Sequence, residues 1–210
     1  GEYIEPHAFT KVYDKNNNLI LDADELRVRR QVFKQSTAYM VVDMLVNAVQ
    51  SGTGTRAKIE GMTVGGKTGT NQDNCGVFFA GITPYYTATL YIGHDYYKPL
   101  VSNASASSAA APLWQAFMSK ILEGRENKPI LSGSAQDYGV VTQTVCPISG
   151  LLPTDACRNS VGGHALVSDY FASDSVPTQT CDMHKTIYIC SYSNQVATPY
   201  CDHAYCTAYN

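Results

Sequence analysis

Residues Lys67, Thr68, Gly69 and Thr70 are the stretch of this sequence whose side chains could do chemistry together. They end a short apolar run typical of a strand, in which Lys67 and Gly69 would share one face and the two threonines the other. Gly69 leaves the backbone open to close approach by a ligand. On an edge strand, an extended peptide could pair with this backbone while the hydroxyls hold its terminal carboxylate and the ammonium supplies positive potential. The stretch therefore predicts a site for a peptide that ends in a carboxylate.

The elements that would position this strand predict an α+β fold. Residues 9–23 read as two extended runs around an Asn-rich turn, which indicates a hairpin. The runs 61–70, 76–82 and 86–94 are short, rich in Thr, Tyr, Phe and Val, and separated by turn residues. We expect them to form an antiparallel meander that contains the Lys67 strand.

Two amphipathic helices would cover that sheet. The first lies within residues 36–54, with Ser36 or Thr37 as N-cap and Gly52 just past its end. The second spans about 107–124, with Ser107 or Ser108 as N-cap. The apolar faces are predicted to consist of Val41, Leu45, Ala48 and Val49 in the first helix and of Leu113, Phe117, Met118 and Ile121 in the second.

Composition limits the class of protein. The chain has 210 residues, 44% of them apolar and 16% charged, which is enough to bury a core. The net charge of −3 and the scattered lysines and arginines argue against nucleic acid as a partner. No apolar run approaches the roughly 18–20 residues that a membrane-spanning helix requires.

The Lys67 stretch and its flanks together resemble a known family. The segment "GGKTGT" is similar to the Lys-Thr-Gly motif of penicillin-binding transpeptidases and serine β-lactamases. The segments "GTGTRA", "FFAGITPYYTATLYIGHD", "EPHAFTKVYDKNNNLI" and "APLWQAFMSKIL" resemble the surrounding run of class A, bifunctional penicillin-binding proteins in order and spacing. The resemblance covers residues 1–125 and implies the C-terminal portion of a transpeptidase domain, with an antiparallel sheet covered by helices.

This resemblance implies roles for the site residues. Lys67 would orient and polarise the catalytic hydroxyls, Thr68 and Thr70 would hold the ligand carboxylate, and the backbone N–H of Thr70 would donate in the oxyanion hole. Lys67 and Thr70 are thus the expected catalytic residues, and Thr68, Gly69 and Thr70 the expected substrate-binding ones. The implied ligands are peptidoglycan stem peptides ending in D-Ala-D-Ala, which acylate a serine, and β-lactams, which mimic them. No cofactor is expected.

The sequence departs from the family at the serine itself. Neither Ser-x-x-Lys nor Ser-x-Asn occurs in it, although the family uses both to build and activate the nucleophile. We therefore expect the catalytic serine on an upstream segment, this portion to be inactive alone, and the intact protein to lie outside the cytoplasm on an upstream membrane anchor. The alternatives are a β-lactam sensor or inactive penicillin-binding module, or a disulfide-stapled cell-surface structural module.

Cysteines mark a different C-terminal region. Beyond a predicted linker at 126–145, the extension 146–210 holds six of the seven cysteines, and "VCPISGLLPTDAC" (145–157) repeats as "ICSYSNQVATPYC" (189–201) at an offset of 44. Each copy has two cysteines around a turn-forming Ser-Gly or Ser-Asn, which a disulfide could close. Zinc is the competing interpretation, because "CDMH" and "CDHAYC" offer closely spaced thiolates and imidazoles. We favour disulfides and no metal, since disulfides persist outside the cytoplasm. The expected pairs are Cys146–Cys157, Cys190–Cys201 and Cys181–Cys206, with Cys75 unpaired.

Overall fold

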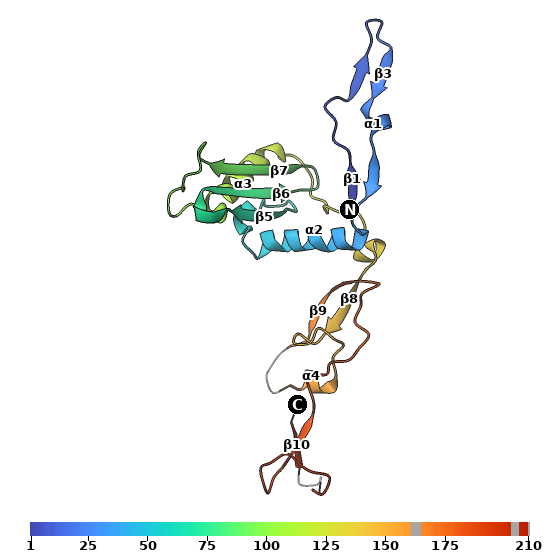
Figure 1. The fold of residues 1–210 in the computed structure, drawn as a ribbon, viewed down its shortest axis with the longest axis vertical. Coiled ribbons are helices and arrows are strands. Elements are labelled where there is room, and N and C mark those ends of the chain that lie inside the picture. Colours follow the sequence, from blue (N-terminus) through green and yellow to red (C-terminus); the bar gives the residue numbers. More distant parts are fainter. Residues whose placement is uncertain (161–164, 203–205, 210) are drawn as a thin grey trace. The chain divides into compact units, whose positions relative to one another are not determined.

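The chain consists of two compact units. The computed structural model describes residues 1–160, 165–202 and 206–209. Unit 1 is Gly1–Ser134 and unit 2 is Ala135–Asn210 (Figure 1).

The N-terminal part of unit 1 forms two pairs of short antiparallel strands around a short helix. Strand β1 (Glu2–Ile4) pairs with β4 (Arg29–Gln31), and β2 (Lys11–Tyr13) pairs with β3 (Leu19–Asp22), which leads into α1 (Ala23–Leu26). The predicted hairpin is present. Its turn is held by Asp14, whose Oδ1 accepts hydrogen bonds from the backbone N–H of Asn16 and of Asn18, both at 2.8 Å. Asn17 has φ of 64°, as the Asn-rich turn requires.

Helix α2 (Gln35–Gln50) is the first predicted amphipathic helix. Its N-cap is Lys34, and no side chain caps it, so neither Ser36 nor Thr37 has the predicted role. The N-cap lies two residues before Ser36 because the Lys34 carbonyl already accepts the Ala38 N–H. Val49 is buried, whereas Val41 at the other end of the predicted apolar face is 43% exposed. Along the predicted face, burial therefore increases from Val41 toward Val49.

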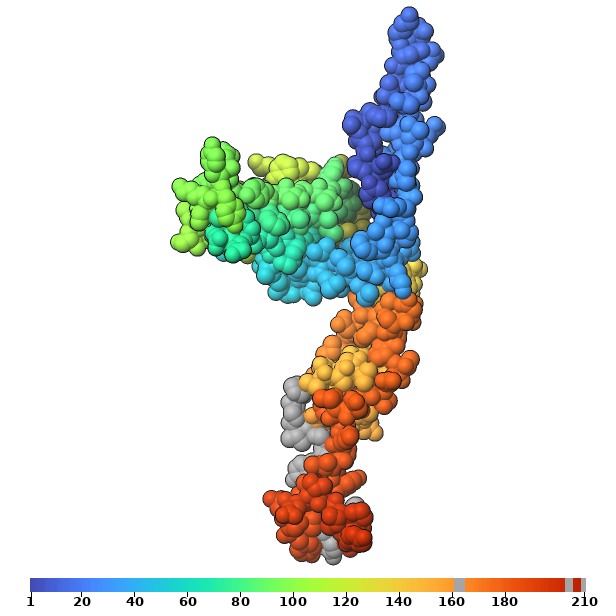
Figure 2. Space-filling model, viewed as in Figure 1, coloured from blue at the N-terminus to red at the C-terminus, as the bar shows by residue number. Residues whose placement is uncertain are grey.

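Three strands form the predicted antiparallel meander. They are β5 (Gly65–Thr70), β6 (Gly76–Ile82) and β7 (Thr87–Gly93), in that order across the sheet. In the space-filling view, the segment from α2 to the last helix of the unit is one closely packed body (Figure 2). Its core is centred on Phe79 and Trp114, whose ring centroids lie 5.1 Å apart in an edge-to-face contact.

Helix α3 (Ala111–Ile121) covers the sheet with a different face from the one predicted. It buries Trp114 and Met118, while Leu113 is 54%, Phe117 56% and Ile121 40% exposed. Trp114 and Met118 are four residues apart and therefore lie on one face of the helix. This face is turned inward because the Trp114 indole fills the space above Gly81, where a Cβ on residue 81 would overlap the indole. Of the four predicted face residues, only Met118 is correct.

The predicted cap of this helix also differs. A π-helical turn (Ala106–Ala110) precedes α3, and its N-cap is Ser105 rather than Ser107 or Ser108. Ser105 Oγ accepts the Ser108 N–H at 3.0 Å and the Ser105 N–H donates to Ser108 Oγ at 2.9 Å, so the two serines form a reciprocal capping box.

Unit 2 contains two further strand pairs and one short helix. Strand β8 (Val140–Val145) pairs with β9 (Val167–Ala172), and β10 (Ile187–Cys190) pairs with β11 (Cys206–Tyr209), both antiparallel. Helix α4 (Asp155–Arg158) lies between β8 and β9 in the chain. Because β8 starts at Val140, ordered structure begins inside the stretch 126–145 that was predicted to be a linker.

Candidate functional site

Strand β5 carries Lys67–Thr70 at an edge of the sheet. Lys67 lies opposite Ala80 and Gly69 opposite Phe78 in the register with β6. Among the described residues, no strand pairs with the other edge of β5. That edge of β5 therefore makes no ladder hydrogen bonds to another described strand, which is the condition that strand addition requires.

Two glycines of β5 lie beneath phenylalanine rings of β6. A Cβ at Gly66 would overlap the ring of Phe79, and a Cβ at Gly69 would overlap the ring of Phe78. Phe79 is fully buried, whereas Phe78 is 39% exposed and covers Gly69 from outside the core. Gly69 is thus required by its own cross-strand neighbour, a reason that adds to the ligand approach inferred from the sequence.

Lys67, Thr68 and Thr53 form a chain of hydrogen bonds beside this edge. Lys67 Nζ donates to the Thr68 carbonyl at 3.0 Å and to Thr68 Oγ1 at 3.3 Å. Thr68 Oγ1 lies 2.7 Å from Thr53 Oγ1. Strand alternation places Lys67 and Thr68 on opposite faces, but the long lysine side chain bends back across the strand. Thr70 is exposed at the end of β5, opposite Val77.

Thr53 is a site residue that the sequence analysis did not single out. It lies in the loop after α2, where the N–H groups of Gly52 and Gly54 both donate to the Ala48 carbonyl, at 3.1 and 3.0 Å. Gly54 is buried, and a Cβ there would come within 3.3 Å of the Phe79 ring. The glycines on each side of Thr53 therefore direct its hydroxyl toward β5. The "GTGTRA" segment was the signal that could have identified it.

The tight turn after β5 fixes the far end of the strand. Asn71 N–H donates to the Gly76 carbonyl at 3.0 Å, and its Oδ1 accepts the Gly76 N–H at 2.6 Å. Tyr97 OH donates to the Gln72 carbonyl at 3.0 Å, and burial together with the Cys75 thiol raises the pKa of Tyr97. Cys75 itself is buried and free. Its Sγ lies 3.7 Å from the Asp73 carbonyl inside the turn, and it is unpaired as the sequence predicts.

A groove in unit 1 does not include the Lys67 strand. It has a volume of about 480 Å³ and lies between α2 and the segment 127–133, and none of its lining residues belongs to β5.

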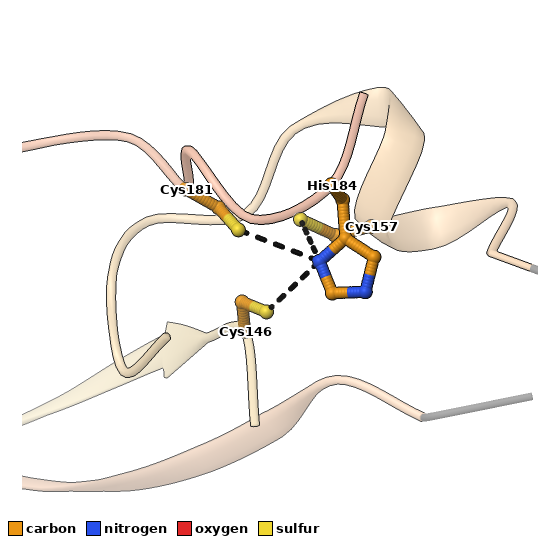
Figure 3. A group of neighbouring side chains, drawn as sticks. All are labelled: Cys146, Cys157, Cys181 and His184. Carbon is orange, nitrogen blue, oxygen red and sulfur yellow. Dashed lines mark hydrogen bonds between the residues drawn. The ribbon is translucent and has the colours of Figure 1, made fainter. Parts of the chain in front are cut away.

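The structure does not form the predicted disulfides, and all seven cysteines are free thiols. Cys146 and Cys157 are neighbours, as the repeat suggests, but Cys181 and His184 join them in one group (Figure 3). Cys206, the predicted partner of Cys181, lies opposite Cys190 in the β10–β11 pair. The physical reason is that the Cys181 segment returns to the first loop, where Cys181 N–H donates to the Leu152 carbonyl at 2.8 Å. The expectation of no metal is thereby put in question, because this group could hold an ion.

Comparisons with known proteins agree with this architecture. The family description "Penicillin binding protein transpeptidase domain" matches residues 1–119, and "Penicillin-binding protein 1A, C-terminal domain" matches residues 136–186. Penicillin-binding protein 1A of Clostridium perfringens (strain ATCC 13124) is 34% identical over 86% of this chain and 21% of its own length. That of Clostridium botulinum (strain Langeland) is 31% identical over 95% of this chain and 23% of its own length.

A solved structure shows the same fold. The crystal structure of penicillin-binding protein 1A from Haemophilus influenzae aligns with a TM-score of 0.60 and 19% identity, over 85% of this chain and 30% of the other. The family match over residues 1–119 gives the class of protein, a penicillin-binding transpeptidase domain. The chain belongs to the penicillin-binding protein transpeptidase family, and it spans about a fifth of the length of the penicillin-binding proteins 1A it matches. Within the described residues, no helix combines the length and the apolar character needed to cross a membrane.

Proposed function

We propose that this chain forms the donor-binding strand of a peptidoglycan D,D-transpeptidase, and that the nucleophilic serine is supplied by an upstream segment. The observation that carries the proposal is the open edge of β5 with the Lys67–Thr68–Thr53 hydrogen-bond chain beside it. An open strand edge suits an extended stem peptide, and hydroxyls beside an ammonium suit its terminal carboxylate.

In the proposed reaction, the serine oxygen attacks the carbonyl carbon of the penultimate D-Ala and loses its proton to a base. The peptide C–N bond then breaks, the leaving D-Ala takes up a proton, and a serine ester remains. An amine from a neighbouring stem peptide attacks that ester and releases the serine. Lys67 would stabilise the negative charge that develops around the serine, and the Thr70 N–H would donate to the oxyanion. A β-lactam would form a serine ester of the same kind, but its leaving nitrogen would stay attached to the acyl group through the opened ring.

Exposed apolar side chains favour a covering segment. Leu113, Phe117 and Ile121 lie on one stripe of α3, and Val41 and Met44 on α2 are 43% and 60% exposed. Clustered apolar side chains of this size commonly mark an interface. We propose that the upstream part of the same protein packs on these helices and carries the serine. An extracytoplasmic location and an upstream membrane anchor belong to the same proposal.

The test is acylation of the intact protein by a fluorescent penicillin. Lys67→Ala should slow acylation by about 10²- to 10³-fold, as loss of a transition-state charge partner does. Thr53→Val should slow it by about two- to tenfold, because it removes one neutral hydrogen bond to Thr68. Lys58→Ala, which removes an exposed lysine outside β5, is the matched control and should leave the rate unchanged.

A second readout separates the enzyme from a sensor. Release of D-Ala from a stem-peptide donor, lost in Lys67→Ala, supports the transpeptidase. Acylation by penicillin without any D-Ala release would instead identify a β-lactam sensor or inactive module. An unchanged acylation rate in Lys67→Ala would remove Lys67 from the site and refute the proposal.

A further inference from the structure

Three cysteines and one histidine of unit 2 converge on a common point. Cys146 follows β8, Cys157 lies on α4, and Cys181 and His184 lie in the segment before β10 (Figure 3). Their ligand atoms all lie within 4.8 Å of one another. The three cysteines are buried, with 0%, 2% and 6% of their surface exposed. Such a convergence from three separate segments needs a physical cause.

Hydrogen bonding alone does not supply that cause. The sulfurs of Cys146, Cys157 and Cys181 lie 3.5, 3.6 and 3.4 Å from the same atom, His184 Nδ1. A ring nitrogen either carries one proton or offers one lone pair, so it makes one good hydrogen bond and not three. Disulfide formation does not explain the group either, because three thiols cannot all pair and none of them is paired.

A tetrahedral metal ion explains the distances. With Zn–S near 2.3 Å and Zn–N near 2.0–2.1 Å, tetrahedral angles place each ligand sulfur about 3.6 Å from the ligand nitrogen. All three observed S–N separations agree with that value within about 0.2 Å. Three sulfurs and one imidazole nitrogen also form one of the standard structural zinc sets.

Polar groups around the sulfurs favour the thiolate form that a metal requires. Thr154 brings its N–H and its Oγ1 to 3.4 Å from the Cys157 sulfur. Polar hydrogens beside this sulfur stabilise a thiolate, which is the form of cysteine that binds a metal ion.

Few large apolar side chains are buried among the described residues of unit 2. The buried cluster at this end of the unit consists of Cys146, Cys157 and Cys181, with Leu166 packed against it. A region of this size with so few large apolar side chains commonly relies on a metal or on disulfides.

From this geometry we infer that Cys146, Cys157, Cys181 and His184 bind one Zn²⁺ ion, which ties the β8–α4 loop to the segment before β10. The site is structural, because four protein ligands fill the tetrahedron and leave no position for substrate. It lies in the cysteine-rich extension and is independent of the donor strand in unit 1.

The second copy of the repeat has the same contacts within its own loop as the first copy. Thr198 brings its N–H to 3.4 Å and its Oγ1 to 3.5 Å from Cys201, as Thr154 does with Cys157. Asn194 N–H donates to the Cys190 carbonyl, as Gly150 does to Cys146. Within the described residues, only the first copy gains a histidine from a returning segment. The first copy is therefore the one that the zinc inference concerns.

The experiment maps cysteine reactivity in the full reduced chain loaded with zinc and freed of excess metal. We expect about one zinc per chain at this site, and alkylation of Cys146, Cys157 and Cys181 that is slower by about tenfold or more than after treatment with a strong chelator. His184→Ala should abolish that chelator-sensitive protection. His184→Cys, which keeps four ligands, should retain it. Cys201→Ser, the equivalent position in the second copy, is the matched control and should leave protection of the three cysteines intact.

Cobalt gives an independent readout on the unaltered chain. Co²⁺ should produce the visible bands of a tetrahedral ion together with thiolate charge-transfer absorption, and zinc should displace both. The inference is overturned if the reduced chain retains no zinc, if alkylation of the three cysteines is the same with and without chelator, or if His184→Cys protects no better than His184→Ala. A Cys146–Cys157 disulfide in the protein isolated without reductant would also overturn it.

Discussion

Replacing Trp114 by alanine should be among the most damaging single changes in unit 1. The indole is 1% exposed, packs edge-to-face on Phe79, and fills the space over Gly81. Its Nε1–H donates to the Ala88 carbonyl at 2.9 Å, which joins α3 to β7. Phe79 in turn packs on Gly66 of β5, the residue before Lys67. Loss of the indole should therefore weaken the packing of the strand that carries Lys67.

The expected cost follows from these contacts. A fully buried Trp→Ala change costs about 3–5 kcal/mol of unfolding free energy through lost transfer energy and the cavity left behind. Within that total, the edge-to-face contact accounts for about 0.5–1.5 kcal/mol. Trp114→Phe keeps a ring but leaves the Ala88 carbonyl without its donor, which should cost about 1–3 kcal/mol.

Hydrogen exchange of β6 and β7 peptides, followed by mass spectrometry, measures the opening free energy of this sheet separately from unit 2. Lys120→Ala on the same helix is the control, since that side chain is exposed and the change should alter the opening free energy by no more than about 0.5 kcal/mol. If Trp114→Ala costs no more than Lys120→Ala, the assignment of the buried face of α3 is wrong.

Two further predictions concern the site strand and the hairpin. Gly69→Ala should destabilise β5 by about 1–3 kcal/mol because the added Cβ meets the Phe78 ring. In a Phe78→Ala background the same change should cost clearly less. If hydrogen exchange gives the same destabilisation in both backgrounds, the clash with Phe78 is contradicted. Hydrogen bonding from Lys11 and then from the Asp24 N–H lowers the pKa of Asp22. The stabilising contribution of Asp22 to the β2–β3 hairpin is therefore present above about pH 4 and is lost as the pH falls through the lowered pKa. Amide exchange in β2 and β3, corrected for intrinsic rates, should become faster in that pH range, and Asp22→Asn should weaken this pH dependence.

Local signals predicted the elements of unit 1 well. The 9–23 hairpin, both helices and the three-strand meander are confirmed, because turn residues and periodicity specify them within a few residues of chain. Caps and faces were less predictable. Ser105 and Ser108 cap each other, so the choice among several serines depends on geometry, and the buried face of α3 depends on where Trp114 meets β7. Thr53 reaches the site only through the fold of the loop after α2.

Cysteine grouping depended on a contact that no local pattern contains. The repeat correctly predicts the proximity of Cys146 and Cys157, since eleven residues and a turn at Gly150, with φ of 71°, bring them together. The third thiol and the imidazole belong to the segment 179–184, which pairs with Leu152 through two backbone hydrogen bonds. The Leu152 N–H donates to the Gln179 carbonyl, and the Cys181 N–H donates to the Leu152 carbonyl. Two thiols alone are compatible with either a disulfide or a metal. The addition of Cys181 and His184 around one point is what distinguishes them, because a disulfide uses two sulfurs and would leave the third buried thiol outside the bond.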